Sequence, residues 1–128
     1  SKIFYTEYAA WADRLYGTPR NPWSLIIEGT HCFVCALFSA ITILTSANGN
    51  YELSNATLYI AMTAQAMNSI LYIVQYMIQT RQKDSPNYDS EDFPCGQYLL
   101  DRPFMWINIF WTLMPSLIMF INLFDILL

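Results

Sequence analysis

Three long apolar stretches, separated by polar segments, dominate the pattern of this chain. They cover residues 23–44, 56–80 and 103–127. Each holds about 20 to 25 residues, the length that a helix needs to cross the hydrocarbon core of a bilayer. A soluble helix bundle would need a continuous polar stripe along each helix, and these stretches lack one. The pattern predicts an all-α membrane protein with three transmembrane helices in a single membrane domain, 1–128.

A shorter helix is expected ahead of the first span. Aromatic and small residues recur there at spacings of three and four: Tyr5, Tyr8, Ala9, Trp11, Ala12 and Tyr16. This spacing predicts a short amphipathic helix lying on the membrane surface. The segment lacks the apolar core of a signal peptide and is too acidic for a transit peptide.

Composition and charge placement agree with three spans. Hydrophobic residues make up 55% of the chain and charged residues 12%, a balance more apolar than that of soluble domains. An odd number of spans puts every cation on one side of the membrane: Lys2, Arg14, Arg20, Arg81, Lys83 and Arg102. The positive-inside rule then predicts a cytoplasmic N-terminus, or a matrix-facing one in a mitochondrion.

The cysteines and the histidine do not form a recognisable metal or redox site. Cys32 and Cys35 lie inside the first span, where thiolate formation is disfavoured, and we expect both to pack as small apolar residues. Zinc bound by these two cysteines and His31 would lack a fourth ligand. The chain also lacks a glycine-rich phosphate loop and a basic patch. We expect no metal, no cofactor and no nucleic-acid partner.

Polar residues inside the spans are the candidates for function. The first span carries Glu28 and His31, three residues apart on one face; the second carries Gln65, Asn68 and Tyr72; the third carries Asn108, Trp111 and Thr112. Ionisable groups inside a membrane are costly and mark functional sites. A carboxylate buried there alone would cost several kcal/mol, which favours a neutral Glu28 or a Glu28–His31 pair.

These polar residues lie at matching depths. With a rise of about 1.5 Å per residue, Glu28 and Asn108 lie about 8 Å from the cytoplasmic ends of their helices. His31, Trp111 and Tyr72 lie about 12 Å from those ends, and Asn68 lies about 18 Å from the cytoplasmic end of its helix. The match predicts one shared polar cavity in the cytoplasmic half of the membrane, although small polar residues also join membrane helices for purely structural reasons.

The same residues resemble a known family. The third span, with Asn108-x-x-Trp111-x-x-x-Pro115, is similar to the last membrane helix of the emopamil-binding protein family, the sterol Δ8–Δ7 isomerases and their EXPERA-domain relatives. Further matching positions are Glu7-Tyr8-Ala9, Asp13-x-x-Tyr16, Glu28 at the position of a catalytic glutamate, Gln65 and Leu71-Tyr72. The resemblance covers a three-helix part of the family, whose members have further helices ahead of it.

The resemblance implies a sterol or terpenoid double-bond isomerase. Glu28, His31, Asn108 and Trp111 would be catalytic, and Gln65, Asn68, Tyr72 and Thr112 would bind the ligand. A carboxylic acid would protonate a ring alkene, the Trp face would stabilise the carbocation, and a base would remove a neighbouring proton. It also implies an endoplasmic reticulum membrane and a flat, sterol-like ligand.

Two other functions remain open from the sequence. One is a non-catalytic module that binds lipid or sterol. The other is a small structural subunit of a larger membrane complex, such as a respiratory assembly in the mitochondrial inner membrane. Membrane lipids are partners in every case, and other membrane subunits or a second copy are expected as well.

Overall fold

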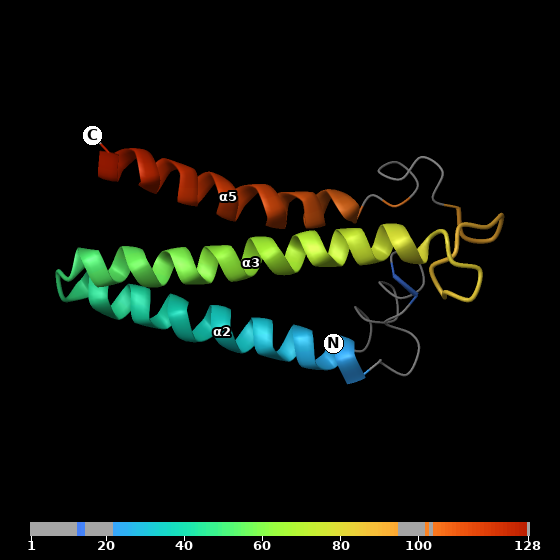
Figure 1. Cartoon of the computed structure of the whole chain (residues 1–128), viewed down its shortest axis with the longest axis horizontal. Helices are drawn as coiled ribbons and strands as arrows, with labels where there is room; N and C mark the ends of the chain where they lie inside the picture. Colours follow the sequence, from blue (N-terminus) through green and yellow to red (C-terminus); the bar gives the residue numbers. More distant parts are fainter. Residues whose placement is uncertain (1–12, 15–21, 95–101, 103, 128) are drawn as a thin grey trace.

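The computed structural model describes residues 13–14, 22–94, 102 and 104–127. Within these ranges the chain forms the helices α2 (Pro22–Ala47), α3 (Tyr51–Gln79) and α5 (Met105–Leu127) (Figure 1). All three are long and apolar enough to cross a membrane. The predicted all-α architecture with three membrane helices is therefore confirmed. The expected interfacial helix lies outside the described residues, apart from Asp13 and Arg14.

The turn between the first two helices is tighter than the apolar pattern predicts. α2 continues to Ala47, and α3 begins at Tyr51 rather than at residue 56. Gly49 has a φ of 74°, a left-handed conformation that glycine adopts without steric cost. The Asn50 side chain then caps α3 by accepting a hydrogen bond from the Leu53 amide at 3.2 Å. The polar residues after this cap form the first turns of α3 instead of a loop.

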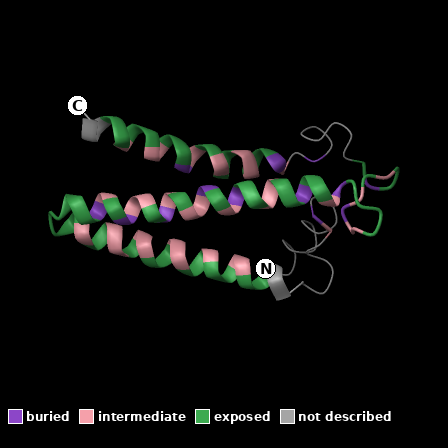
Figure 2. Ribbon diagram, in the orientation of Figure 1, coloured by how far each residue is buried: buried purple, intermediate pink, exposed green. Residues whose placement is uncertain are grey.

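The three helices form a single layer with α3 in the middle. α2 and α5 each pack on α3, and in the described part of the chain they do not pack on each other (Figure 1). The buried positions of α3 are mostly small: Ser54, Thr57, Ala61, Ala66, Ser69 and Tyr76. Small residues let membrane helices approach closely. The outer faces are exposed and apolar, as expected for contact with lipid (Figure 2).

Hydroxyl groups join α2 to α3 near the turn. The hydroxyl oxygens of Thr42 and Thr57 lie 2.8 Å apart, and the Ser54 hydroxyl donates to the Thr42 carbonyl oxygen at 3.1 Å. Such bonds between membrane helices contribute about 0.6 kcal/mol each to helix association, since the separated helices also find partners for these groups. This end of the helix pair is closed by small and polar contacts.

The opposite end of the layer is closed by a polar turn region and Arg102. The guanidinium of Arg102 donates to the Tyr76 hydroxyl, to the Phe93 carbonyl at 2.6 Å and to the Pro94 carbonyl at 3.2 Å. It also lies 3.6 Å from the centre of the Phe93 ring, and Arg102 is only 1% exposed. Arg102 therefore ties the start of α5 to the C-terminal part of α3 and to the turns that follow it.

Candidate functional site

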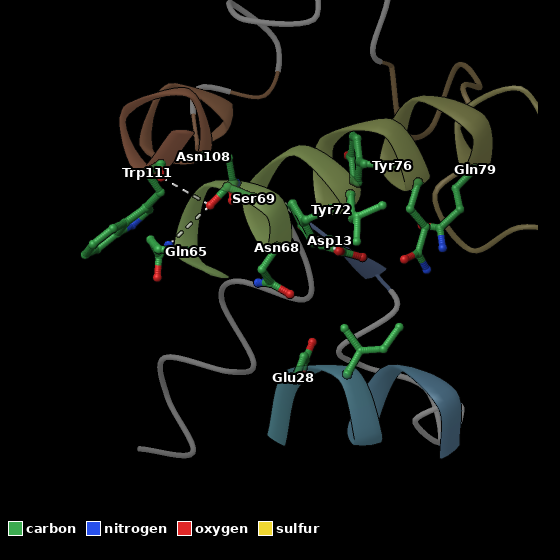
Figure 3. A pocket seen from close by; sticks show the side chains of 13 residues that line it. Asp13, Glu28, Gln65, Asn68, Ser69, Tyr72, Tyr76, Gln79, Asn108 and Trp111 are labelled. Atoms are coloured by element: carbon green, nitrogen blue, oxygen red, sulfur yellow. Dashed lines mark hydrogen bonds between the residues drawn. The ribbon is translucent and has the colours of Figure 1, made fainter. Parts of the chain in front are cut away.

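A cavity of about 280 Å³ opens among the three helices, near the N-terminal ends of α2 and α5 (Figure 3). Its α2 wall is Ile27 and Glu28, and its α5 wall is Asn108 and Trp111. Residues of α3 lie between these walls, since α3 is the middle helix of the layer. The volume lies just below the lower end of the range for small-molecule sites.

Six of the eight residues singled out in the sequence line this cavity: Glu28, Gln65, Asn68, Tyr72, Asn108 and Trp111. They come from all three helices, and Figure 3 shows Glu28 on one side and Trp111 and Asn108 on the other. α2 and α5 run in the same direction and α3 runs against them. Four of the residues that the depth comparison groups therefore line one cavity, namely Glu28, Tyr72, Asn108 and Trp111, whereas His31 of the same group does not.

The other two residues lie outside the cavity lining. The ring of His31 contacts the sulfur of Cys35 one turn further along α2, at 3.5 Å, and that sulfur approaches the Ala61 carbonyl oxygen of α3 at 3.7 Å. The Thr112 hydroxyl donates to the Asn108 carbonyl oxygen of its own helix at 3.0 Å. Both residues make packing contacts within or between helices, so the structure does not bring them together with the other six.

The structure adds a carboxylate that the apolar pattern did not indicate. Asp13 lines the cavity, is 2% exposed, and accepts a hydrogen bond from the Tyr72 hydroxyl at 2.7 Å. It is 59 residues from Tyr72 in the chain, and no periodic pattern reveals a contact at that separation. Two further lining residues, Gln75 and Gln79, could have been found from the sequence. They continue the helical spacing of the polar face that Gln65, Asn68 and Tyr72 form on α3.

Ser69 links the middle of the cavity to α5. Gln65 Nε2 donates to the Ser69 hydroxyl at 3.2 Å, and that hydroxyl donates to the Trp111 carbonyl oxygen at 3.3 Å (Figure 3). Ser69 itself is buried. These two bonds hold the backbone of α5 at the residue whose indole ring lines the cavity.

A second group of hydrogen bonds closes the membrane-surface end of the cavity. Asn87, in the turns after α3, is fully buried. Its amide nitrogen donates to Asp13 Oδ1 at 2.7 Å and to Gln79 Oε1 at 2.9 Å. Its amide oxygen accepts the Arg14 backbone N–H at 2.8 Å. Both acceptors of Asn87 line the cavity, so this group orders the end wall.

The cavity brings together two carboxyl groups, those of Asp13 and Glu28, with several amides and aromatic rings. Glu28 can exchange a proton, the amides can hydrogen-bond a ligand in either sense, and the faces of Trp111 and Tyr72 can stabilise positive charge. Among the described residues no three His, Cys, Asp or Glu side chains are grouped so as to hold a metal ion.

Comparisons of this chain with protein-family models, with curated proteins and with solved structures found no match.

Proposed function

We propose that this chain is a membrane protein of the emopamil-binding protein type, in which the cavity binds a flat, sterol-like molecule and isomerises a double bond in it. A single observation carries the proposal: Glu28 lines the same cavity as Asn108 and Trp111. Glu28 lies on α2 and the other two residues lie on α5, and these two helices do not pack on each other. An acid, an amide and an indole brought together in this way support a site better than they support helix packing.

The proposed reaction begins with proton transfer from the Glu28 carboxyl group to one carbon of the alkene. The O–H bond breaks, a C–H bond forms, and the neighbouring carbon becomes a carbocation. The carboxylate left on Glu28 then removes a proton from an adjacent carbon, which forms the shifted double bond and restores the acid. The step balances with no oxidant, reductant or further reagent, and one side chain serves as acid and then as base.

The remaining residues of the cavity have supporting roles in this proposal. The Trp111 ring stabilises the carbocation, because indole is the strongest of the protein rings toward cations. Asn108 lies on the same wall, one turn before Trp111, and its amide orients the acid or the ligand. The indole of Trp111 is 43% exposed, so a ligand dissolved in the membrane reaches it from the lipid side.

Two parts of the proposal rest on the resemblance alone. They are the endoplasmic reticulum as the location and a sterol as the natural ligand. His31 and Thr112 receive no catalytic or binding role here, because they lie outside the cavity lining.

The test uses the purified chain in lipid nanodiscs with a sterol that carries a ring double bond. Between turnovers the proton on Glu28 exchanges with solvent in this proposal, so turnover in D₂O should place one deuterium in the product at the carbon that Glu28 protonates, as read by mass spectrometry. Glu28→Gln should abolish both turnover and deuterium incorporation. The matched control is Glu52→Gln, a glutamate in the first turn of α3 that is exposed and distant from the cavity, and it should keep both.

Other results would point to the alternative functions. Sterol binding without turnover in the unmodified chain would indicate a lipid-binding module. Purification only within a large stable complex, with no bound sterol, would indicate a structural subunit. Full activity of Glu28→Gln would contradict the catalytic assignment.

A further inference from the structure

A second hollow lies beside the cavity, at the end of α3. It is a cleft of about 410 Å³ formed by the last residue of the helix and the turns that follow: Gln79, Gln82, Lys83, Asp84, Ser85 and Pro86. Its lining includes an exposed amide, an exposed ammonium and an exposed carboxylate, which are groups that favour water over lipid. The cleft therefore faces the aqueous phase at the membrane surface.

Gln79 lines both hollows. Among the described residues it is the one that the cavity and the cleft share, and it lies at the opposite end of the cavity from Trp111 (Figure 3). Each hollow is several times larger than the space of about 30 Å³ that one water molecule occupies in the liquid. Gln79 therefore separates the aqueous cleft from the cavity that Glu28 lines.

The neighbouring end wall is held more firmly than Gln79. Asn87 is fully buried, and its side chain bonds to Asp13 and to the Arg14 backbone. Its backbone N–H also donates to Ser85 Oγ at 3.1 Å. Within the described ranges the Gln79 side chain makes one hydrogen bond, in which its oxygen accepts from Asn87 at 2.9 Å. Turning Gln79 away breaks that bond alone, whereas moving Asn87 breaks several.

The other lining residues do not offer a comparable connection to water. Tyr76 and Asp13 lie near the same end, but they are 1% and 2% exposed and do not line the cleft. The indole of Trp111 is exposed on the lipid side, and the hydrocarbon core of a bilayer holds no water. Gln75 lines the cavity one helical turn before Gln79, so it continues the polar wall inward from the cleft.

We infer that Gln79 controls the route by which the Glu28 carboxyl group exchanges its proton with water. Water passes from the cleft into the cavity when the Gln79 side chain turns away from Asn87, whereas the ligand enters from the lipid side. Gln79 touches no reacting atom and acts through water, so it is a positioning residue. The inference rests on the proposed function, since it assumes that Glu28 gives up and regains a proton.

The origin of the transferred hydrogen makes this route measurable. In the proposed reaction Glu28 gives one proton to the alkene and takes another from an adjacent carbon, so the acid ends each turnover with a hydrogen from the sterol. In D₂O, exchange replaces the O–H of Glu28 by O–D and releases HOD. Without exchange, the hydrogen of one sterol is passed to the next. The rate of turnover is the same in both cases, and only the isotope in the product differs.

The experiment compares variants of Gln79 in nanodiscs, with the ring-unsaturated sterol in D₂O over many turnovers. The unmodified chain should place one deuterium in each product molecule. Gln79→Leu fills the space with an apolar side chain, and the product should lose most of its deuterium while turnover continues. Gln79→Ala leaves the space open and should keep the deuterium. Gln82→Leu is the matched control, because this exposed glutamine lines the cleft but not the cavity, and it should keep the deuterium too.

A second measurement needs no turnover. The infrared carbonyl band of a protonated carboxyl group moves to lower frequency when its hydrogen is replaced by deuterium. The band of Glu28 is identified by its loss in Glu28→Gln. After transfer into D₂O this band should shift more slowly in Gln79→Leu than in the unmodified chain or in Gln82→Leu.

The outcomes separate this inference from the proposed function. Full deuterium incorporation by Gln79→Leu, or an unchanged rate of the infrared shift, overturns the inference and leaves the isomerase proposal standing. Both Gln79→Leu and Gln79→Ala remove the bond to Asn87, so equal loss of deuterium in the two would show a merely structural role and also overturn it.

Two further results are decided by the same measurements. Absence of turnover in the unmodified chain would contradict the proposed function, and the infrared rates would then decide whether Gln79 controls the route. Should Gln79→Leu fail to fold, Gln79→Met takes its place, because it keeps the length and flexibility of the side chain without its amide.

Discussion

The Ser69 hydroxyl donates to the carbonyl oxygen of Trp111, and this is the carbonyl that Pro115 leaves without its usual partner. Proline lacks an N–H, so the residue four positions earlier in a helix loses its intrahelical hydrogen bond. In α5 that residue is Trp111, and the helix still runs through Pro115 to Leu127. A side chain of α3 therefore supplies the hydrogen bond that the α5 backbone lacks beside the cavity.

This relationship predicts a specific coupling between Ser69 and Pro115. Ser69→Ala should lower the free energy of unfolding by about 1 kcal/mol, because the Trp111 carbonyl is left without a partner in lipid. Ser116→Ala should change it little, since Ser116 is exposed and its hydroxyl bonds only within α5. In a Pro115→Ala background residue 115 regains its N–H, and Ser69→Ala should then cost clearly less. The free energies of unfolding of the two single variants and the double variant, measured in mixed micelles, form a double-mutant cycle. If the losses from Ser69→Ala and Pro115→Ala simply add in the double variant, the coupling is refuted.

Removal of the Trp111 ring should slow the reaction more than it weakens binding. A desolvated cation–π contact is worth about 2 kcal/mol, so Trp111→Leu should lower kcat about tenfold to thirtyfold. Trp111→Phe should retain part of the rate because it keeps an aromatic face. Trp106→Leu is the control, since Trp106 lies on the same helix, is 56% exposed and does not line the cavity. Equal effects at both tryptophans would count against a carbocation at Trp111.

Arg102 should contribute strongly to stability although it lies in no helix. Arg102→Ala removes the buried guanidinium donor from the Tyr76, Phe93 and Pro94 oxygens, and a loss of about 2 to 3 kcal/mol is expected. Arg102→Lys should recover only part of it, because an ammonium cannot reproduce the fork of guanidinium donors. Arg81→Ala, at an exposed position, should stay within about 0.5 kcal/mol. Thermal unfolding followed by circular dichroism compares the three, and similar values for Arg102 and Arg81 would contradict this role.

Two glycines should respond with opposite signs to the same substitution. Gly49 has a φ of 74°, so Gly49→Ala should destabilise the chain by about 1 kcal/mol through backbone strain. Gly29 lies inside α2, and an added methyl group there would meet no atom within 4 Å. Gly29→Ala should therefore stabilise the helix by up to about 1 kcal/mol. A fall in Tm for the first and a rise for the second is expected; a fall for both would show that α2 needs Gly29 for another reason.

Much of this fold is readable in the sequence because lipid imposes a simple length rule. An apolar run of about 20 residues has few alternatives to a spanning helix, and all three runs became helices. The start of α3 was less predictable. The apolar run begins only at residue 56, yet α3 begins at Tyr51, and Ser54 in its first turns is buried and bonds across to Thr42. Tertiary contact, not local preference, decides the state of such residues.

The cavity was predictable only in part, for a related reason. Helical periodicity and the fixed rise of the helix place Glu28, Tyr72 and Trp111 at similar depth on the polar faces of the three helices. Asp13 and Asn87 belong to segments outside the three spans, and they meet 74 residues apart in the chain. A periodic pattern cannot report a contact of this kind.

The spacing of these contacts along the chain bears on the order in which the protein assembles. α2 and α3 are joined by a turn of three residues, 48–50, so their pairing closes a very short loop. The cavity needs a contact between Ser69 and Trp111, which are 42 positions apart in the chain, and one between Asp13 and Tyr72, which are 59 positions apart. Local pairs form before distant ones, because longer loops cost more entropy to close. We expect the α2–α3 hairpin to form during synthesis, before α5 emerges from the ribosome, and the ligand site to be completed only after the whole chain is in the membrane.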